Sequence, residues 1–282
     1  MADIDDLNLD KTPAPPPPPQ PRWIPILAVA VLVLALLAVW YYLRRDSALE
    51  TTAGRQTAAP EAARDQIAEP PAVDLPPLDE SDAFVRDLVQ RLSQHPVVMS
   101  LLATDGLIRT FAVSMLNIGD GDTPTRHLNR IKPEASFGVR KQRTRTYVDP
   151  SSYARFDAHA AAISGLDAAG VAQAYNTLKP RLQEALREVA GPNADIDRTL
   201  QRAIVQLLGA PVVEGDVAVV PEIVGYSYAD PTLASLSRAQ QQLVRMGPAN
   251  TRRVQQKLRE VAAQLGIDPS SLPPERVIGG SR

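Results

Sequence analysis

The chain contains no cysteine, and this absence removes several classes of site at once. Disulfide bonds, thiolate metal sites, iron–sulfur clusters and cysteine nucleophiles all require the missing side chain. The folded part must therefore be held together by its own apolar packing. The absence does not decide between cytoplasm and periplasm.

Histidine clusters and catalytic motifs are missing as well. The three histidines, His95, His127 and His159, are far apart and lack the spacing of metal ligands. The sequence has no glycine-rich phosphate loop and no Gly-x-Ser-x-Gly or Ser-x-x-Lys motif. We therefore expect no metal, no cofactor and no acyl-transfer chemistry.

Carboxylates are the remaining candidates for catalysis. Asp149, Asp157 and Asp230 are the side chains that would form a hydrolytic pair. Asp149 and Asp230 each precede a proline after an expected strand, and a turn or helix cap explains that placement without chemistry. A hydrolase of an envelope polymer is therefore the third of three hypotheses.

Strong net charge and aromatic residues are also lacking. The net charge is −2, so the chain as a whole does not attract nucleic acid, and we expect no nucleic-acid partner. Aromatic residues make up 5% of the chain, whereas Leu, Val and Ala are plentiful. This composition is typical of a helix-rich core.

One long hydrophobic run dominates what is present. Every residue from Ile24 to Leu43 is apolar or aromatic. As a helix, a run of this length spans about 30 Å, the thickness of the hydrocarbon core of a bilayer. Aromatic residues mark both ends of the run, as is typical of membrane interfaces: Trp23, Trp40, Tyr41 and Tyr42. We predict a transmembrane helix over residues 23–43 and the lipid bilayer as a partner.

The segments around this span divide the chain into five parts. Residues 1–22 are acidic and then proline-rich, which predicts a disordered tail. Residues 44–74 are rich in Ala, Pro, Glu and Thr and have no apolar period, which predicts a disordered linker. A folded domain is expected over 75–266, followed by a disordered tail over 267–282.

Within the domain the apolar pattern is mostly helical. We predict helices after Leu78, over 97–103, over 107–118, over 151–159, after the caps Asp167 and Asp195, over 232–246 and after the cap Asn250. Pro180 should kink or divide the helix that follows Asp167. A β-hairpin is expected over 136–148 and a second β region over 212–228. The predicted fold class is α+β, mainly helical, with one N-terminal transmembrane helix and a small antiparallel β element.

One local charge pattern rises above the background. Seven cations lie between residues 126 and 145 against the single acid Glu134: Arg126, Arg130, Lys132, Arg140, Lys141, Arg143 and Arg145. Arg143 and Arg145 should share one face of a strand, because strand side chains alternate. We name these seven residues the basic ribbon. It suits phosphates of lipid head groups or an anionic envelope polymer, while a solvated hairpin balanced by acids elsewhere is the competing interpretation.

Several stretches resemble one bacterial family, the domain of unknown function 3014. They are LPPLDESD at 75–82, LIRTFAV at 107–113, VDPSSYARFD at 148–157, YADPTL at 228–233 and LSRAQQQLVRMGPAN at 236–250. The similarity covers about residues 75–265, and Arg245-Met-Gly-Pro248 is its most distinctive piece. The resemblance implies a proteobacterial protein with an N-terminal anchor in the inner membrane. It implies no activity and no catalytic residues.

Two features of the sequence give opposite predictions for the side of the membrane on which the domain lies. More arginines follow the span than precede it, which favours the cytoplasm. The order of short tail, anchor, tether and domain is typical of envelope proteins that reach into the periplasm, and we favour the periplasm. The leading hypothesis is a non-enzymatic interaction or scaffold module with an envelope protein as its partner. The second is a binder of anionic ligand through the basic ribbon.

Overall fold

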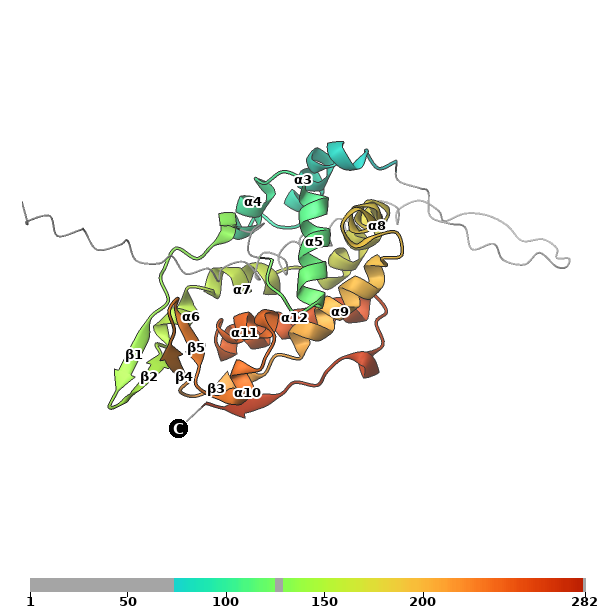
Figure 1. Ribbon diagram of the computed structural model, residues 1–282. Helices are drawn as coiled ribbons and strands as arrows, with labels where there is room; N and C mark the ends of the chain where they lie inside the picture. The colour runs from blue at the N-terminus through green and yellow to red at the C-terminus, as the bar shows by residue number, and fades with distance from the viewer. Residues whose placement is uncertain (1–73, 125–128, 281–282) are drawn as a thin grey trace, which may run out of the picture.

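The computed structural model describes residues 74–124 and 129–280 (Figure 1). The predicted membrane span 23–43 lies outside the described residues, and so do the tail 1–22 and nearly all of the linker 44–74. The interface anchors of this span are outside them too: Trp23, Trp40, Tyr41 and Tyr42. In the two described ranges, no single helix has the length and hydropathy to cross a bilayer; α4 and α5 pass that test only as a pair bent by 109°.

The described chain is a helix-rich α+β structure with a small antiparallel sheet, which confirms that part of the predicted fold. The helices and 3-10 turns are η1 Leu78–Glu80, α3 Asp82–Gln90, α4 Pro96–Leu102, α5 Leu107–Gly119, η2 Asn129–Ile131, α6 Ser151–Ala154, α7 Asp157–Ser164, α8 Ala168–Ala190, α9 Ile196–Leu208, α10 Pro231–Ala234, α11 Arg238–Val244, α12 Pro248–Gln264 and η3 Pro269–Ser271. The strands are β1 Val139–Gln142, β2 Arg145–Val148, β3 Val212–Glu214, β4 Ala218–Pro221, β5 Tyr226–Tyr228 and β6 Val277–Gly279.

Helix α5 forms the centre of the helical part. It packs against α8 and α9, while α12 packs across α7, α8 and α9 (Figure 1). The side chains of α5 that are fully buried include Leu107, Phe111, Met115 and Ile118. The helix predicted over 107–118 is confirmed. It is favoured because a helix buries apolar side chains on several sides at once.

Helix α3 supplies the caps of the two helices that follow it. The Asp82 carboxylate accepts hydrogen bonds from the backbone N–H groups of Gly106, at 2.7 Å, and Leu107, at 2.8 Å. These groups start α5 and have no partner inside that helix. One turn later, Arg86 donates to the Leu102 carbonyl that ends α4, at 2.8 Å. Each charge thus lies at the helix end that favours it.

Two small β elements lie at one end of the helical part. The larger sheet is antiparallel with strand order β1-β2-β4-β5, and β3 pairs in parallel with β6. In Figure 1 the described chain begins beside α3, at the opposite end of the molecule from the β1–β2 hairpin. The molecule is therefore elongated, with a helical end and a sheet end.

The C-terminal segment differs from its prediction. Residues 267–282 are expected as a disordered tail, yet η3 and β6 form within 267–280, the part of this segment that is described. Val277 pairs with Val212, and Arg259 of α12 donates to the Pro273 carbonyl at 2.6 Å. The prolines and glycines of this segment prevent a helix, but they allow a strand that completes the edge of β3.

Three further boundaries differ from the sequence interpretation. Pro180 lies inside one continuous helix, α8, and does not divide it. The helix expected over 232–246 is divided into α10 and α11 between Ser235 and Ser237, and Ser237 starts α11 with a capping box. Asn250 is not the cap of α12, which begins at Pro248 after Gly247.

We predict that Asp82→Ala destabilises the protein by about 1–2 kcal/mol, because it leaves the first N–H groups of α5 without an acceptor. The measurement is urea unfolding of the detergent-solubilised full chain, followed by circular dichroism. Asp87→Ala on the same helix is the control, since Asp87 makes only an exposed pair with Arg91. Equal effects of the two variants would contradict the capping role.

We also predict a loss of stability in mild acid that depends on His159. Burial lowers the pKa of His159, and a hydrogen bond with the Ile131 carbonyl at 2.7 Å opposes that shift more weakly. The unfolded chain therefore takes up the proton first, so stability falls as the pH drops below about 6.5. His159→Gln should flatten this dependence between about pH 7.5 and about pH 5 in urea titrations. An unchanged slope would reject the assignment.

Candidate functional site

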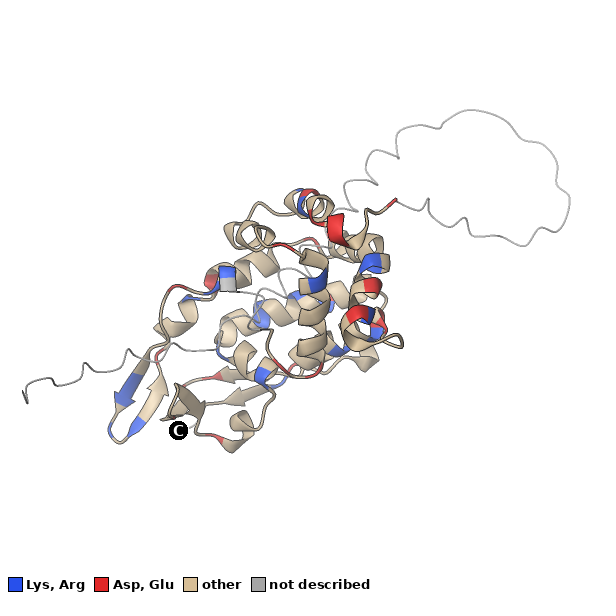
Figure 2. Ribbon diagram, turned by 45° about the horizontal axis from the view of Figure 1, so that its top comes forward, with Lys and Arg blue, Asp and Glu red and all other residues tan. Residues whose placement is uncertain are grey.

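The structure spreads the basic ribbon over separate places. Arg126 lies outside the described residues. Arg130 lies in η2, which packs beside α4, and Lys132 follows η2; both side chains are exposed. The other four cations lie on the β1–β2 hairpin (Figure 2): Arg140, Lys141, Arg143 and Arg145. The ribbon is therefore not one continuous surface among the described residues, and its densest part is the hairpin.

The register of the hairpin decides which cations share a face. Gln142 pairs with Arg145, and Arg140 lies two residues before Gln142, so Arg140 and Arg145 share one face. Lys141 points to the other face. The prediction that Arg143 and Arg145 share a strand face is wrong, because Arg143 lies in the turn between the strands.

Arg140 has a structural role. It forms an ion pair with Asp216 in the loop before β4. Its guanidinium carbon lies 5.9 Å from the centre of the Tyr147 ring. The Tyr147 contact lies within the hairpin, between β1 and β2, whereas the ion pair joins the hairpin to the loop before β4 and balances the Arg140 charge.

Arg143 adopts a backbone conformation that is unusual for its type. Its φ angle is 54°, in the left-handed region, at the first of the two turn residues. Glycine, asparagine and aspartate are preferred at this position, and other residues cost of order 1 kcal/mol there. A cation at such a position gives up stability, which is consistent with a role for its charge.

An exposed apolar tip lies at the β4–β5 connection, and sequence reasoning missed it. Val220 is 45% exposed, Val224 is 50% exposed and Ile223 is 99% exposed. The sequence interpretation counted Val224 as part of a strand, whereas β5 begins only at Tyr226. The signal available in the sequence was the glycine at position 225, which marks the end of a turn that contains two aliphatic residues.

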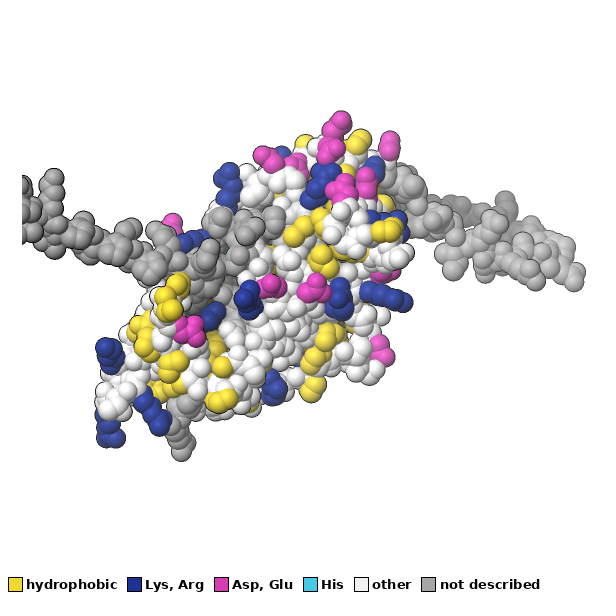
Figure 3. Space-filling view, viewed as in Figure 1, with side chains coloured by type: hydrophobic (Ala, Val, Ile, Leu, Met, Phe, Trp, Pro, Cys, Tyr) yellow, Lys and Arg dark blue, Asp and Glu magenta, His cyan; other side chains and the backbone are white. Residues whose placement is uncertain are grey.

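The apolar tip and the hairpin turn border one open hollow. Its volume is about 700 Å³, and Thr144, Arg145, Val220 and Pro221 are among the residues that line it. Figure 3 shows hydrophobic side chains gathered at this end of the molecule, with Lys and Arg side chains at their margin. We name this region the sheet-end surface: the hairpin turn with Lys141, Arg143 and Arg145, and the tip from Val220 to Val224.

The three candidate catalytic carboxylates each make a structural hydrogen bond. Asp149 accepts from the Ser151 N–H at 2.9 Å and from the Ser151 hydroxyl at 2.8 Å. Asp230 accepts from the Thr232 N–H at 2.8 Å at the start of α10. Asp157 accepts from the Asn250 amide at 2.8 Å. Turn and cap geometry thus accounts for their positions.

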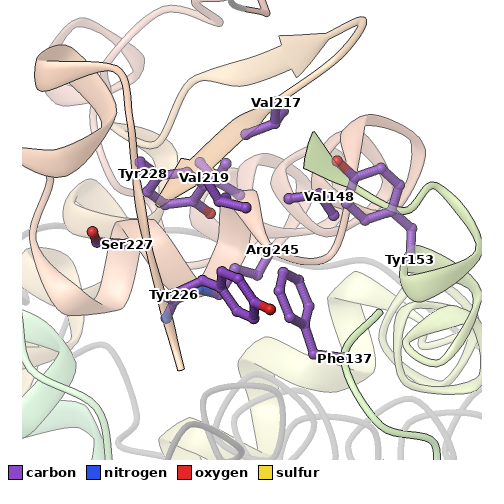
Figure 4. A pocket seen from close by; sticks show the side chains of 10 residues that line it. Phe137, Val148, Tyr153, Val217, Val219, Tyr226, Ser227, Tyr228 and Arg245 are labelled. Carbon is purple, nitrogen blue, oxygen red and sulfur yellow. The ribbon is translucent and has the colours of Figure 1, made fainter. Parts of the chain in front are cut away.

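A second cavity, the aromatic pocket, lies on the inner face of the four-stranded sheet (Figure 4). It is small, with about 10 Å³ of space for the centre of a water-sized sphere, which is room for about one water molecule. Its lining is Phe137, Val148, Tyr153, Val217, Val219, Tyr226, Ser227, Tyr228, Val244 and Arg245. In Figure 4 the rings of Tyr226 and Phe137 lie next to each other, 5.9 Å apart between centres, and Arg245 extends toward them.

Burial raises the pKa values of two tyrosines of this pocket, Tyr153 and Tyr228. It raises the pKa of Tyr153 to about 12, and the charge of Asp216 adds to the effect. Burial likewise raises the pKa of Tyr228, whose hydroxyl donates to the Gln241 carbonyl at 3.1 Å. Both phenols therefore stay neutral at physiological pH and act as hydrogen-bonding groups.

The Arg245-Met-Gly-Pro248 sequence places Arg245 at this pocket. Met246 is fully buried, and Pro248 opens α12 with the fixed φ that a first helical residue needs. Gly247 has a φ of 84°, and a Cβ atom there would lie 2.4 Å from Cγ of Tyr153. Only glycine allows both the turn and this approach, so the motif fixes Arg245 against the sheet.

Histidine and acidic side chains of the described residues form no group of three that suits a metal ion. His95 accepts from the Val97 N–H at 3.2 Å at the start of α4, and His159 is buried against η2. His127 lies outside the described ranges. The site therefore offers cations, aromatic rings and apolar surface as its chemistry.

Comparison with known proteins gives one family. No curated protein and no solved structure matches the chain. A family model with the description "Protein of unknown function (DUF3014)" matches residues 107–262, more than half of the 282 residues. This range contains the hairpin, the apolar tip and the whole aromatic pocket, and the chain belongs to that family.

Proposed function

We propose that this chain is a single-pass protein of a bacterial inner membrane whose folded domain is a non-enzymatic interaction module. The domain binds a protein partner of the cell envelope through the sheet-end surface. The observation that carries the proposal is the cluster of exposed aliphatic side chains at the β4–β5 tip beside the cationic hairpin turn. Clustered exposed apolar groups with a polar margin are typical of binding surfaces.

The anchor is supported by the sequence. The run from Ile24 to Leu43 has the length and the aromatic ends of a membrane helix. The predicted linker, residues 44–74, then provides a tether that reaches at most ~100 Å when fully extended. Such a tether keeps the domain near one membrane and raises its concentration for partners there.

The position of the sheet-end surface favours a partner away from the bilayer. The described chain begins at the helical end, and the hairpin lies at the far end (Figure 1). The surface also borders an open hollow, whose volume is about 700 Å³. A protruding protein segment fills a hollow, whereas a flat bilayer does not. The cations at its margin favour a partner with acidic residues around an apolar protrusion.

Anionic ligand is the second candidate for the same surface. Lys141, Arg143 and Arg145 are exposed on the hairpin, and the left-handed backbone of Arg143 favours a role for its charge. Lipid head groups and envelope polymers both carry the phosphates or carboxylates that such cations bind. This candidate does not use Ile223 or Val224, which separates it from the first.

We propose the periplasm as the compartment of the domain. The order of tail, anchor, tether and domain favours that side, although the arginines after the span favour the cytoplasm. A reporter enzyme that is active in only one compartment, fused after Arg282, decides between the two.

The anchor predicts that the full-length protein stays in the membrane pellet after extraction with alkaline carbonate. Peripheral proteins leave the membrane under these conditions, whereas a spanning helix is held by its buried apolar surface. The measurement is immunoblotting of pellet and supernatant from bacterial membranes. A variant that lacks residues 24–43 is the control and should be soluble. Release of the full-length protein would contradict the anchor.

The interaction surface predicts that Ile223→Asp removes specific partners from chemical crosslinking in intact membranes. The substitution places a charge on the exposed apolar tip beside the hollow, so a partner should be recovered at least about tenfold less. Val189→Asp, at an aliphatic residue of the helical end that is 48% exposed, is the matched control and should recover the partner normally. Partners are identified by mass spectrometry.

The cations give a second comparison in the same experiment. The double variant Arg143→Glu and Arg145→Glu should weaken recovery of a protein partner and abolish salt-sensitive binding to anionic vesicles. The anionic-ligand candidate is favoured if the double variant loses binding to anionic vesicles while Ile223→Asp binds them as the wild type does. Recovery of the same proteins by all variants would contradict the proposed surface.

A further inference from the structure

Strand β1 forms an open edge of the four-stranded sheet. Within residues 74–124 and 129–280 it pairs on one side only, with β2, and Figure 1 shows it at the outer margin of the sheet. At the other edge, β5 packs against α10, and the Tyr228 hydroxyl donates to the Gln241 carbonyl. Among the described residues, β1 is therefore the more open of the two edges.

The hydrogen bonds beside the hairpin fix the direction of its backbone groups. The Asp149 N–H donates to the Gly138 carbonyl at 3.1 Å, so these residues form a hydrogen-bonded pair of the antiparallel ladder. The Val148 N–H donates instead to the Val217 carbonyl, on the β4 side, at 2.9 Å. Val148 therefore turns its backbone groups away from β1, as expected of the pair next to a hydrogen-bonded one.

This alternation points the N–H and C=O groups of Val139 and Lys141 to the open side of β1. Val139 pairs with Val148, and Lys141 pairs with Thr146 two positions along the register. In the described ranges these outward backbone groups have no hydrogen-bond partner. A row of unpaired donors and acceptors at a sheet edge is the template on which a further strand is added.

The side chains of β1 limit which strand fits. Val139 and Lys141 share one face, because strand side chains alternate. Val139 packs half-buried against the apolar cluster of the sheet, which includes Val148 and Val219, whereas Lys141 is exposed. An added antiparallel strand places one side chain opposite each of the two, and such pairs interact. An apolar residue opposite Val139 extends the cluster, and an acidic residue opposite Lys141 pairs with its charge.

The charge of the hairpin also favours one kind of occupant. Arg140 is already paired with Asp216, whereas Lys141 and Arg143 form no ion pair within the part of the chain that the structure describes. A second copy of this chain would bring like charges together along the edge, which disfavours self-pairing. An acidic strand from another protein gains from the same charges.

We propose that β1 receives an extended acidic segment of the partner protein as an additional antiparallel strand. The segment carries an acidic residue opposite Lys141 and, two residues later in its own sequence, an apolar residue opposite Val139. Main-chain hydrogen bonds hold the segment, and these two side-chain pairs select it. The inference deepens the proposed function and rests on it, because Lys141 belongs to the sheet-end surface.

The test is titration of the full chain in nanodiscs with two fluorescein-labelled peptides, Thr-Glu-Thr-Val-Thr-amide and Thr-Lys-Thr-Val-Thr-amide, followed by fluorescence anisotropy. We expect the glutamate peptide to bind about fivefold or more tightly than the lysine peptide, because only the first places an opposite charge beside Lys141. In protein labelled with 15N-lysine, the glutamate peptide should also slow hydrogen exchange of the Lys141 amide, which becomes hydrogen-bonded.

A proline separates the backbone contribution from the charge. Lys141→Pro removes the outward N–H group and leaves the β1–β2 ladder intact, since this group takes no part in that ladder. It should weaken binding of the glutamate peptide at least about tenfold. Lys141→Ala is the matched control, which keeps the N–H group and loses the charge, and it should weaken binding only about threefold.

Four results would overturn the proposal. They are absence of binding of the glutamate peptide, equal affinity of the wild type and a folded Lys141→Pro variant, unchanged exchange of the Lys141 amide on binding, and a dimer in which that amide is protected without peptide. The exchange measurement uses the wild type, so it decides the matter even when Lys141→Pro does not fold.

Failure of this inference is distinguishable from failure of the proposed function. Ile223→Asp leaves the β1 edge unchanged and should bind the glutamate peptide as the wild type does. Absence of peptide binding, together with loss of crosslinked partners in Ile223→Asp, would reject strand addition alone. Peptide binding together with unchanged crosslinked partners in Ile223→Asp would reject the apolar tip as the contact and keep the β1 edge.

Discussion

The burial of α5 is the constraint on which the rest of the described structure depends. Without cysteine the chain has no covalent staple, so its stability comes from the apolar surface that α5, α8, α9 and α12 remove from water together. Phe111 and Met115 are fully buried at the middle of this cluster. The start of α5 is fixed by a side chain from another helix. Asp82 supplies the cap that Gly106, which has no side chain, does not supply.

The sheet end packs through an apolar cluster that includes Leu233 of α10 and Val244 of α11, and polar contacts of α12 lie beside it. The Asn250 amide donates to Asp157 at the start of α7, and the Gln255 amide donates to the Ala210 carbonyl before β3, at 2.8 Å in each case. Both side chains are buried, and a buried amide with partners fixes one arrangement of the elements that it joins. Gly247 adds a close backbone approach to Tyr153. The aromatic pocket is thus held in place by α12, while the β1–β2 turn and the β4–β5 tip extend beyond it.

The sequence predicts the helices of this domain well, because their signals are local. Asp167 and Asp195 cap α8 and α9 as expected, and the 3.6-residue apolar period marks their buried faces. Features that depend on distant residues are not visible in that way. The pairing of β6 with β3, the role of Asp82 at the start of α5 and the bridge from Asn250 to Asp157 each join residues far apart in the chain.

The candidate site likewise combines features that the local sequence predicts with features that only the fold determines. The positive charge of the hairpin is apparent from composition, but the turn at Arg143 moves that residue off the strand face on which simple alternation would place it. The exposure of Ile223 cannot be read from its type, since aliphatic residues between strands are more often buried. Arg155 and Arg245 are 90 residues apart in the sequence, and only the fold brings their charges close enough to interact.

The central claim is that the sheet end, rather than the helical end, meets a partner protein. The most direct measurement is photo-crosslinking in living cells with benzoylphenylalanine placed singly at Ile223, between β4 and β5, or at Val189, in α8, two exposed aliphatic positions. The account predicts a discrete crosslinked species from position 223 and none of that mass from position 189. Crosslinks from position 189 alone, or to lipid alone at position 223, would contradict it.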